Sequence, residues 1–249
     1  MRLVALLLLL CLPALAQERR SGFEDMARDT QAMQRDDAAN PGMLWVEEGA
    51  ALWSRPAGPE GRSCASCHGT AEASMAGVAA RYPAWDEAGS AAIDLAGRIA
   101  QCREQRQHAP ALARESQGLL SLAAFIGLQS RGMVVAPPTD DRLQPARALG
   151  EGLYRQRRGQ LDLSCAQCHD DNAGRRLAGS TIPQAHPTAY PLYRLEWQAL
   201  GSLQRRLRGC MTGVRAEPFD YGAAEFIAIE AWLAQRAAGM AVETPGVRP

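Results

Sequence analysis

Apolar residues recur with helical spacing in two separated stretches of the chain. Residues 119–131 and 223–236 both place apolar side chains at positions i, i+3, i+4 and i+7, which predicts amphipathic helices with one buried face. Gly132 and Gly239 follow these stretches directly and fit the C-terminal ends of such helices. The chain is therefore expected to contain two copies of a helix that closes a folded unit.

These stretches belong to an internal repeat. Residues 49–53 and 150–154 are each predicted as a short amphipathic helix, and each begins 15 residues before the first cysteine of a C-x-x-C-H sequence, at an offset of 101. Further on, residues 98–102 match 206–210 at an offset of 108, and the closing helices match at 107. A repeat of about 105 residues is much longer than a solenoid period, so the pattern predicts two homologous, mainly α-helical domains.

The segments outside the repeat are polar or rich in proline. Residues 134–141 contain two prolines and two aspartates after a predicted helix end, which indicates a linker between the copies. We assign residues 17–45 to an extended N-terminal arm, 46–136 to a first domain and 137–249 to a second, and we expect residues 242–249 to fray.

The N-terminus has the layout of a secretory signal peptide. Arg2 is followed by an apolar run over residues 3–12 and then by an Ala-Leu-Ala sequence that ends at Ala16 and fits a cleavage site. The run is about half as long as a membrane-spanning helix, so we expect cleavage of residues 1–16, export to the periplasm and no membrane anchor. Cleavage removes Cys11 and leaves six cysteines in a compartment that permits disulfides and covalent haem attachment.

Composition narrows the classes of function. The 249 residues carry 27 basic side chains, all of them arginine, against 27 acidic ones. This zero net charge argues against a nucleic-acid-binding protein, which usually shows a basic excess. Hydrophobic residues make up 47% of the chain, which is enough for a packed core.

Each copy of the repeat contains one C-x-x-C-H motif. Such a motif supplies two thiols that form thioethers with haem and a histidine that binds its iron. A zinc site would need further ligands at matched spacing, and a thioredoxin-like redox pair has no need of the histidine. Two motifs at equivalent places therefore predict two cytochrome c-like domains in tandem, each with one covalently bound haem c. The residues concerned are Cys64, Cys67, His68, Cys165, Cys168 and His169.

Several residue types could bind the opposite side of each iron. Met133 and Met240 are repeat equivalents, but they follow the terminal helices, where packing is the commoner role. His108 and His186 are not equivalent, which favours loop or surface roles, although His186 lies in a proline-rich loop that could come near the second haem.

Two cysteines remain after the haem motifs, and they are repeat equivalents. Cys102 and Cys210 follow the proximal histidines by 34 and 41 residues. They either form a disulfide between the domains or each provide a thiolate to the iron of its own domain. The repeat favours one thiolate per domain, because each domain then carries its own complete set of ligands.

An arginine precedes each of these cysteines by four residues. Arg98 and Arg206 would share a helix face with Cys102 and Cys210, lower the pKa of the thiol and bind an oxyanion. The alternative is a solvated basic helix end, which the helix dipole favours in any case. The second copy is the more basic, since Arg205 and Arg208 flank Arg206.

With these motifs in place, the chain resembles the dihaem A subunits of Sox thiosulfate-oxidising systems (SoxA), which are c-type cytochromes with L-cysteine S-thiosulfotransferase activity. The resemblance covers nearly the whole chain after the signal peptide. It is carried by both C-x-x-C-H motifs, by Cys102 and by residues 39–47, 186–187, 190–198 and 206–210.

The resemblance implies a particular chemistry. His169 and Cys210 would bind the iron of the second haem, with Cys210 carried as the catalytic persulfide and Arg206 as the substrate-binding residue. The first haem, with His68 and Cys102, would be a remote centre. Thiosulfate would be joined oxidatively to a cysteine of a SoxYZ-type sulfur-carrier protein, and two electrons would leave through haem to an acceptor cytochrome. A small monohaem cytochrome c of the SoxX type would be the partner subunit.

Three other functions remain open at this stage. A plain dihaem electron carrier would have no substrate. A dihaem peroxidase would need an open or displaceable distal position. A thiosulfate dehydrogenase that forms tetrathionate shares haem c and a distal cysteine, but the length and two-haem layout of this chain fit it less well.

Overall fold

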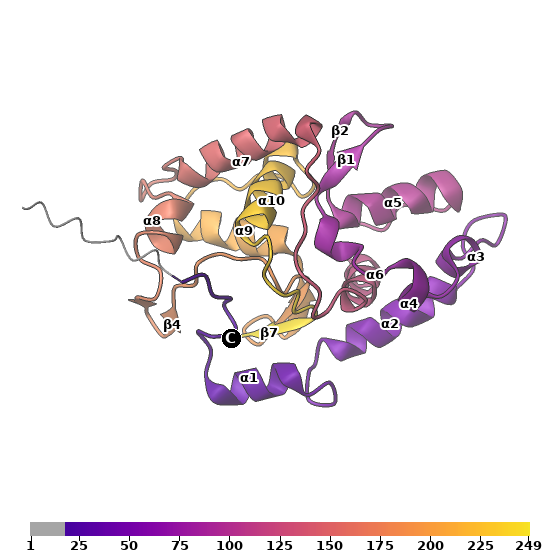
Figure 1. Cartoon of the computed structure of the whole chain (residues 1–249), viewed down its shortest axis with the longest axis horizontal. Helices are drawn as coiled ribbons and strands as arrows, with labels where there is room; N and C mark the ends of the chain where they lie inside the picture. Colours follow the sequence, from indigo (N-terminus) through magenta and orange to yellow (C-terminus); the bar gives the residue numbers. More distant parts are fainter. Residues whose placement is uncertain (1–17) are drawn as a thin grey trace, which may run out of the picture.

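The structure is a computed structural model that describes residues 18–249, and the predicted signal peptide with Cys11 lies outside these residues. The described part is mainly helical, which confirms the predicted fold class, and its two halves lie side by side (Figure 1). One helix, α1 (Arg28–Arg35), precedes both halves. None of the helices in the described part is long and apolar enough to cross a membrane.

The two halves share a common order of a helix, a one-turn helix with the cysteine motif, a β-hairpin and two further helices. The first half consists of α2 (Met43–Ser54), α3 (Cys64–His68), α4 (Ala71–Ser74), the 3-10 helix η1 (Ala79–Arg81), β1 (Ala84–Asp86), β2 (Ala91–Ile93), α5 (Leu95–Arg106) and α6 (Gln117–Leu128). The second half consists of the 3-10 helix η2 (Asp141–Leu143), α7 (Gln144–Arg155), α8 (Cys165–His169), β3 (Arg176–Leu177), β4 (Ser180–Thr181), β5 (Leu192–Arg194), β6 (Ala199–Gly201), α9 (Leu203–Gly213), α10 (Ala224–Arg236) and β7 (Gly246–Arg248).

In each half the helix before the cysteine motif packs against the closing helix. α2 lies on α6 and α7 lies on α10. The close approach requires a glycine in each pair: a Cβ at Gly49 would overlap the carbonyl oxygen of Ser121, and a Cβ at Gly150 would overlap that of Ala228. The two glycines are repeat equivalents, so the same backbone contact builds both halves.

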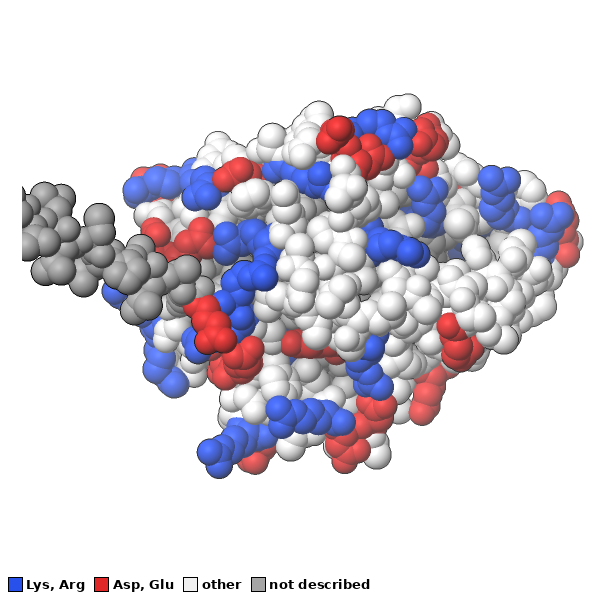
Figure 2. Space-filling view, in the orientation of Figure 1, with Lys and Arg blue, Asp and Glu red and all other residues white. Residues whose placement is uncertain are grey.

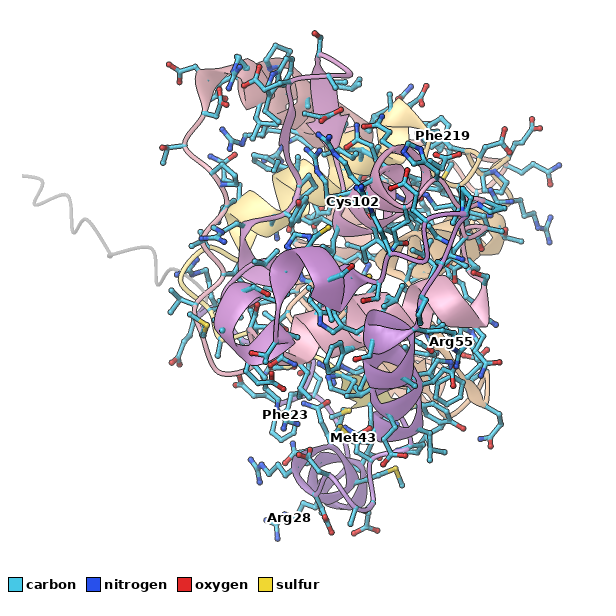
Figure 3. All side chains as sticks on the ribbon, turned by 90° about the vertical axis from the view of Figure 1, so that its right-hand side faces the viewer. Phe23, Arg28, Met43, Arg55, Cys102 and Phe219 are labelled. Atoms are coloured by element: carbon cyan, nitrogen blue, oxygen red, sulfur yellow. The ribbon has the colours of Figure 1, made fainter. Side chains whose placement is uncertain are left out.

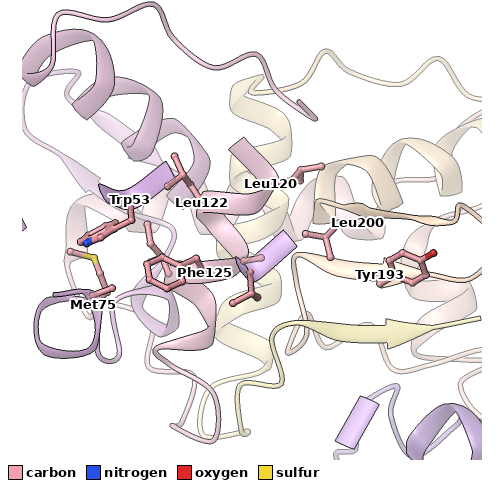
Figure 4. Packing of buried hydrophobic residues seen from close by; sticks show 11 residues of the cluster. Trp53, Met75, Leu120, Leu122, Phe125, Tyr193 and Leu200 are labelled. Atoms are coloured by element: carbon pink, nitrogen blue, oxygen red, sulfur yellow. The ribbon is translucent and has the colours of Figure 1, made fainter. Parts of the chain in front are cut away.

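Each half also contains a short β-hairpin that packs against the other half. β1 pairs with β2 and β5 with β6, both antiparallel, in registers that are related by 108 residues. β2 contacts α10 of the second half, and β6 contacts α6 of the first. Tyr193 and Leu200, from the second hairpin, therefore belong to the same buried cluster as Leu120 and Leu122 of α6 (Figure 4). The hydrophobic core of the first half thus includes the second hairpin, while the rest of the second half has a separate core cluster.

The segments that follow α6 and α10 pair with each other by backbone hydrogen bonds. The N–H of Gly132 donates to the carbonyl of Val242 (2.9 Å), and the equivalent N–H of Gly239 donates to the carbonyl of Val135 (2.8 Å). Two further bonds of 2.8 Å, which are also equivalents of each other, complete the set. The pairing has the symmetry of a two-fold axis between the copies.

The expectation that residues 242–249 fray is wrong. β7 pairs in parallel with β5, and Val247 is fully buried. The N–H of Val247 donates to Oε1 of Gln34 in α1 at 2.9 Å. The N-terminal segment differs from the extended arm expected for residues 17–45, since it contains α1 and since α2 begins at Met43. α1 and the C-terminal strand β7 are packed against each other, and β7 also pairs with β5 of the second half.

Gly150 and Gly152 offer a matched test of the helix contact, since they lie two residues apart in α7. Gly150→Ala should destabilise the haem-loaded protein by about 1–3 kcal/mol, because the added methyl group overlaps the Ala228 carbonyl. Gly152→Ala should stabilise it by about 0.5–1 kcal/mol, because the position is open and alanine favours a helix. Chemical denaturation followed by far-UV circular dichroism measures both changes, and equal effects would contradict the contact described here.

Candidate active site

Both C-x-x-C-H motifs fold into one helical turn with the same cap. In α8 the hydroxyl of Ser164 accepts from the N–H of Gln167 (3.2 Å), and the side chain of Gln167 accepts from the N–H of Ser164 (2.9 Å). Ser63 and Ser66 form the same reciprocal pair in α3. The turn puts the two cysteines and the histidine at positions i, i+3 and i+4, which lie on one helix face.

Hydrogen bonds fix the orientation of the second histidine. Nδ1 of His169 lies 2.7 Å from the carbonyl oxygen of Pro183. Because a carbonyl can only accept, Nδ1 carries the proton, and Nε2 keeps its lone pair for a metal ion. The next residue, Asp170, accepts from the hydroxyl of Tyr154 (2.9 Å) and pairs with Arg236 (2.7 Å).

The first copy uses a tryptophan in place of that tyrosine. Nε1 of Trp53 donates to the carbonyl of Gly69 (3.0 Å), and its ring centroid lies 5.7 Å from that of His68. Trp53 and Tyr154 are repeat equivalents, so in both copies an aromatic side chain of the preceding helix holds the residue that follows the histidine.

Each half contains a cavity that its histidine lines together with the remaining cysteine. In the second half Leu203, Arg206, Leu207 and Cys210 share one face of α9 and line a cavity of about 580 Å³ with His169. In the first half a cavity of about 630 Å³ has the equivalent α5 face as one wall, formed by Leu95, Arg98, Ile99 and Cys102, and Cys64, Cys67 and His68 as another. In the view of Figure 3, Cys102 lies among other side chains near the middle of the molecule.

Both cavities are lined by donors that fit a haem iron, and the first is also lined by the two cysteines of its C-x-x-C-H motif. Cavity volumes near 600 Å³ lie within the range of about 300–1,000 Å³ that is usual for cofactor sites. Each cavity combines an imidazole from one helix with a thiol from another, which is a donor set that iron accepts. Cys165 and Cys168 belong to α8 rather than to the cavity wall. Burial raises the pKa of Cys165 to about 11, and the nearby sulfur of Cys210 contributes in the same direction.

The structure separates the alternatives for the distal position. Cys102 and Cys210 are unpaired and line different cavities, which contradicts the disulfide between the domains. Met133 and Met240 line neither haem cavity, since they lie in the paired segments after α6 and α10. Within residues 18–249 no cluster of three or more His, Cys, Asp or Glu side chains is placed to hold a metal ion alone, so the zinc alternative lacks a ligand set.

The two spare histidines differ in position. His108 is exposed. His186 lines the second cavity, as the sequence allowed, and its Nδ1 lies 2.8 Å from the carbonyl oxygen of Arg20. Burial lowers the pKa of His186.

The surroundings of Cys210 favour its thiolate. Burial by itself would raise the pKa of this thiol, but the His169 imidazole and the positive charge of Arg206 outweigh burial, and the pKa lies below its ordinary value. Within the described residues the guanidinium of Arg206 has no hydrogen-bond or ion-pair partner and lines the cavity. The expected pairing of arginine and cysteine on one helix face is therefore present.

The neighbouring arginines of α9 do not line this cavity. Arg205 lies over the ring of Trp197 at 4.3 Å, while Arg208 lies over Tyr221 at 4.7 Å and donates to the carbonyl of Phe219. On the face of the molecule in Figure 2, basic and acidic side chains are interspersed and form no single basic patch. Of the three arginines at positions 205, 206 and 208, only Arg206 lines the cavity.

Sequence reasoning missed three residues of the second cavity. Arg194 of β5, Trp197 of the hairpin turn and Arg248 of β7 all line it. One indication was available in the repeat, because the offset of 108 aligns Arg194 with Asp86, a reversal of charge. Nothing in the chain pattern indicated that the C-terminal residues reach the site.

Comparison with known proteins identifies the class to which this geometry belongs. A family profile described as the SoxA/TsdA cytochrome c domain matches residues 48–135 and 149–242. The chain therefore belongs to the SoxA/TsdA family of c-type cytochromes, with two such domains in tandem and two covalently bound haems c, as predicted.

Several relatives that are similar over most of the chain are SoxA subunits. The L-cysteine S-thiosulfotransferase subunit SoxA of Rhodovulum sulfidophilum is 38% identical over 93% of this chain and 80% of its own length. The SoxA subunit of Paracoccus pantotrophus is 36% identical over 92% of this chain and 78% of its own length. The crystal structure of SoxXA from P. pantotrophus superposes with a TM-score of 0.89 at 35% identity, covering 93% of this chain and 87% of that one.

Haem attachment can be tested by cysteine substitution. The double substitution Cys165→Ala and Cys168→Ala should remove the mass of one covalently bound haem from the denatured protein, because both thioethers of that motif are lost. Cys102→Ser should leave both haems attached, because Cys102 lies outside the motifs. Intact-mass spectrometry measures the number of haems. Loss of a covalent haem from the Cys102→Ser variant would contradict the assignment.

Proposed function

We propose that the chain is the dihaem subunit of an L-cysteine S-thiosulfotransferase, which joins thiosulfate to a cysteine of a SoxYZ-type sulfur-carrier protein. The observation that carries the proposal is the α9 face, where the unpaired guanidinium of Arg206 and the thiol of Cys210 line one cavity with His169. The thiosulfate dianion could be held there by the guanidinium, next to the reactive sulfur atom of the cysteine. The SoxA relatives are subunits of L-cysteine S-thiosulfotransferases, which supports the same function.

The reaction balances as an oxidation. A bond forms between the terminal sulfur of thiosulfate and the cysteine sulfur of the carrier, the thiol proton of the carrier is released, and two electrons are removed. Haem, when bound, supplies the route by which single electrons leave toward an acceptor cytochrome. No other oxidant is needed for the balance.

The residues of this chain divide the remaining work. We assign Cys64, Cys67, His68 and Cys102 to the first haem, and Cys165, Cys168, His169 and Cys210 to the second. Cys210 is the catalytic sulfur, carried as a persulfide, which is a reversible oxidised state of a reactive cysteine. Arg206 binds and orients the thiosulfate dianion through charge-assisted hydrogen bonds, since no other residue of the described chain occupies its guanidinium.

The proposal includes partners and location. A small monohaem cytochrome c of the SoxX type is the partner subunit, and the similarity to the SoxXA complex of P. pantotrophus supports this. Residues 46–136 and 137–249 are the two haem domains, and residues 1–16 direct export to the periplasm.

The cysteine beside Arg206 argues against a peroxidase, which needs an open distal position.

Cys210 and Cys102 provide a matched pair of variants. Cys210→Met should lower thiosulfate-dependent modification of the carrier by at least about a thousandfold, because the reacting sulfur is lost while the haems stay attached. Cys102→Met should retain most of the modification, since Cys102 lines the other cavity. Mass spectrometry of the carrier measures the adduct.

Two outcomes would contradict the proposed function. Intact carrier modification by the Cys210→Met variant would exclude Cys210 as the reacting sulfur. Formation of tetrathionate by the unmodified protein without any carrier would instead support a thiosulfate dehydrogenase.

A further inference from the structure

The internal repeat allows the two cavities to be compared residue by residue. An offset of 108 relates β1 and β2 to β5 and β6, and it relates Arg98 and Cys102 of α5 to Arg206 and Cys210 of α9. The cis peptide bonds before Pro83 and Pro191 are related by the same offset. At these positions the two sites share a backbone geometry and differ in their side chains.

In the first cavity the arginine is neutralised by its own half. Nη1 of Arg98 lies 2.9 Å from Oδ1 of Asp86, whose carboxylate is buried. Gln101 joins the two groups, since its Nε2 donates to Asp86 (2.9 Å) and its Oε1 accepts from Arg98. The hydrogen bond from Gln101 and the charge of Arg98 lower the pKa of Asp86, so this carboxyl stays ionised. The positive charge of Arg98 is thus neutralised without a ligand.

In the second cavity both of these partners are replaced. Arg194 stands at the position of Asp86, and Gly209 stands at the position of Gln101. A Cβ at Gly209 would meet open space, so nothing fills the room that a glutamine side chain would take. Arg206 has lost a carboxylate and an amide, and it has gained a second cation as neighbour.

Arg194 is held in the cavity wall with part of its guanidinium unused. Its side chain is 16% exposed, Nη2 pairs with the exposed Glu196 at 2.9 Å, and Nε is buried without a hydrogen-bond partner. Burial and the positive charge of Arg206 lower the pKa of Arg194. An unpartnered buried donor beside a like charge is unfavourable unless a ligand completes it.

The rest of the hairpin positions Arg194 toward the cavity. Its guanidinium lies 5.3 Å from the ring centroid of Trp197. Gly201 permits this arrangement, since a Cβ there would overlap the Trp197 ring. The other charges on the cavity wall are already used or exposed: Arg248 pairs with Glu243 at 2.7 Å, Asp25 pairs with Arg20 at 2.8 Å, and Arg176 is exposed.

We propose that Arg194 is a second anion-binding residue of this site and shares the two negative charges of thiosulfate with Arg206. The inference rests on the proposed function and extends it, because a dianion matches two guanidinium groups better than one. The first copy has Asp86 and Gln101, which neutralise its arginine, at the positions where the second copy has Arg194 and Gly209. This difference distinguishes the copy that we propose to bind the substrate from the one that does not.

The test compares the KM and the Kd for thiosulfate between Arg194 variants of the complete, haem-loaded protein in complex with its partner subunit. Arg194→Gln should raise the KM for thiosulfate, and the Kd for thiosulfate measured by calorimetry without the carrier, by about ten- to a hundredfold, the range expected for a lost charge-assisted hydrogen bond. Arg194→Lys should recover part of the loss. Arg194→Asp should weaken binding further, because it recreates the carboxylate that occupies Arg98 in the first copy.

Arg208→Gln is the matched control, since it also removes one arginine charge, but from a position in α9 that does not line the cavity. In this variant the KM and the Kd for thiosulfate should stay within about twofold of the unmodified protein. The absorption spectrum and the count of covalent haems verify that each variant is folded. Unchanged KM and Kd for thiosulfate in Arg194→Gln would overturn the inference while leaving the proposed function intact. A raised KM for the carrier alone would overturn it as well, because Arg194 would then recognise the carrier. Absence of carrier modification in the unmodified protein would instead count against the proposed function, and the Kd would still decide the role of Arg194.

Discussion

One buried hydrogen bond joins the first turns of the two helices that carry Cys102 and Cys210. Nε2 of Gln204, in α9, donates to Oδ2 of Asp94, the N-terminal cap of α5, at 3.1 Å. Asp94 is also held by both terminal nitrogens of Arg114. Since Gln204 and Asp94 are both buried, loss of either partner would leave an unsatisfied polar group in the core. α5 and α9 start from this joint, so the places of Cys102 and Cys210 in their cavities depend on it.

The part of the site that could be predicted from sequence is the part that is local. One helical turn sets the geometry of each C-x-x-C-H motif, and another sets the relation of Arg206 to Cys210, so periodicity and spacing were sufficient. Other features depend on pairing between distant segments. The C-terminal residues become a strand only because β5 offers a free edge, and Arg194 reaches the cavity only because its hairpin packs on the other half. Neither contact leaves a trace in the local pattern of apolar and polar positions.

The duplicated architecture separates what the fold needs from what the chemistry needs. Gly49 and Gly150 are the same in both copies because two backbones meet there, and the capping serines recur because both one-turn helices need the same start. Positions 86 and 194 share a backbone place but carry opposite charges. A residue that differs between copies on an unchanged backbone is free of the packing constraint, and it can be selected for its charge alone.

The hydrogen bonds between the ends of the two copies have a further consequence. Each end contacts the equivalent of itself, which is the isologous pattern that two identical subunits form across a two-fold axis. A chain of half this length would carry the surface needed for a homodimer. Joining two such chains by a linker replaces an association that depends on concentration with one that does not. Covalent linkage also removes the requirement that the two halves be identical, so each cavity can carry its own charge pattern, as the difference between Asp86 and Arg194 shows.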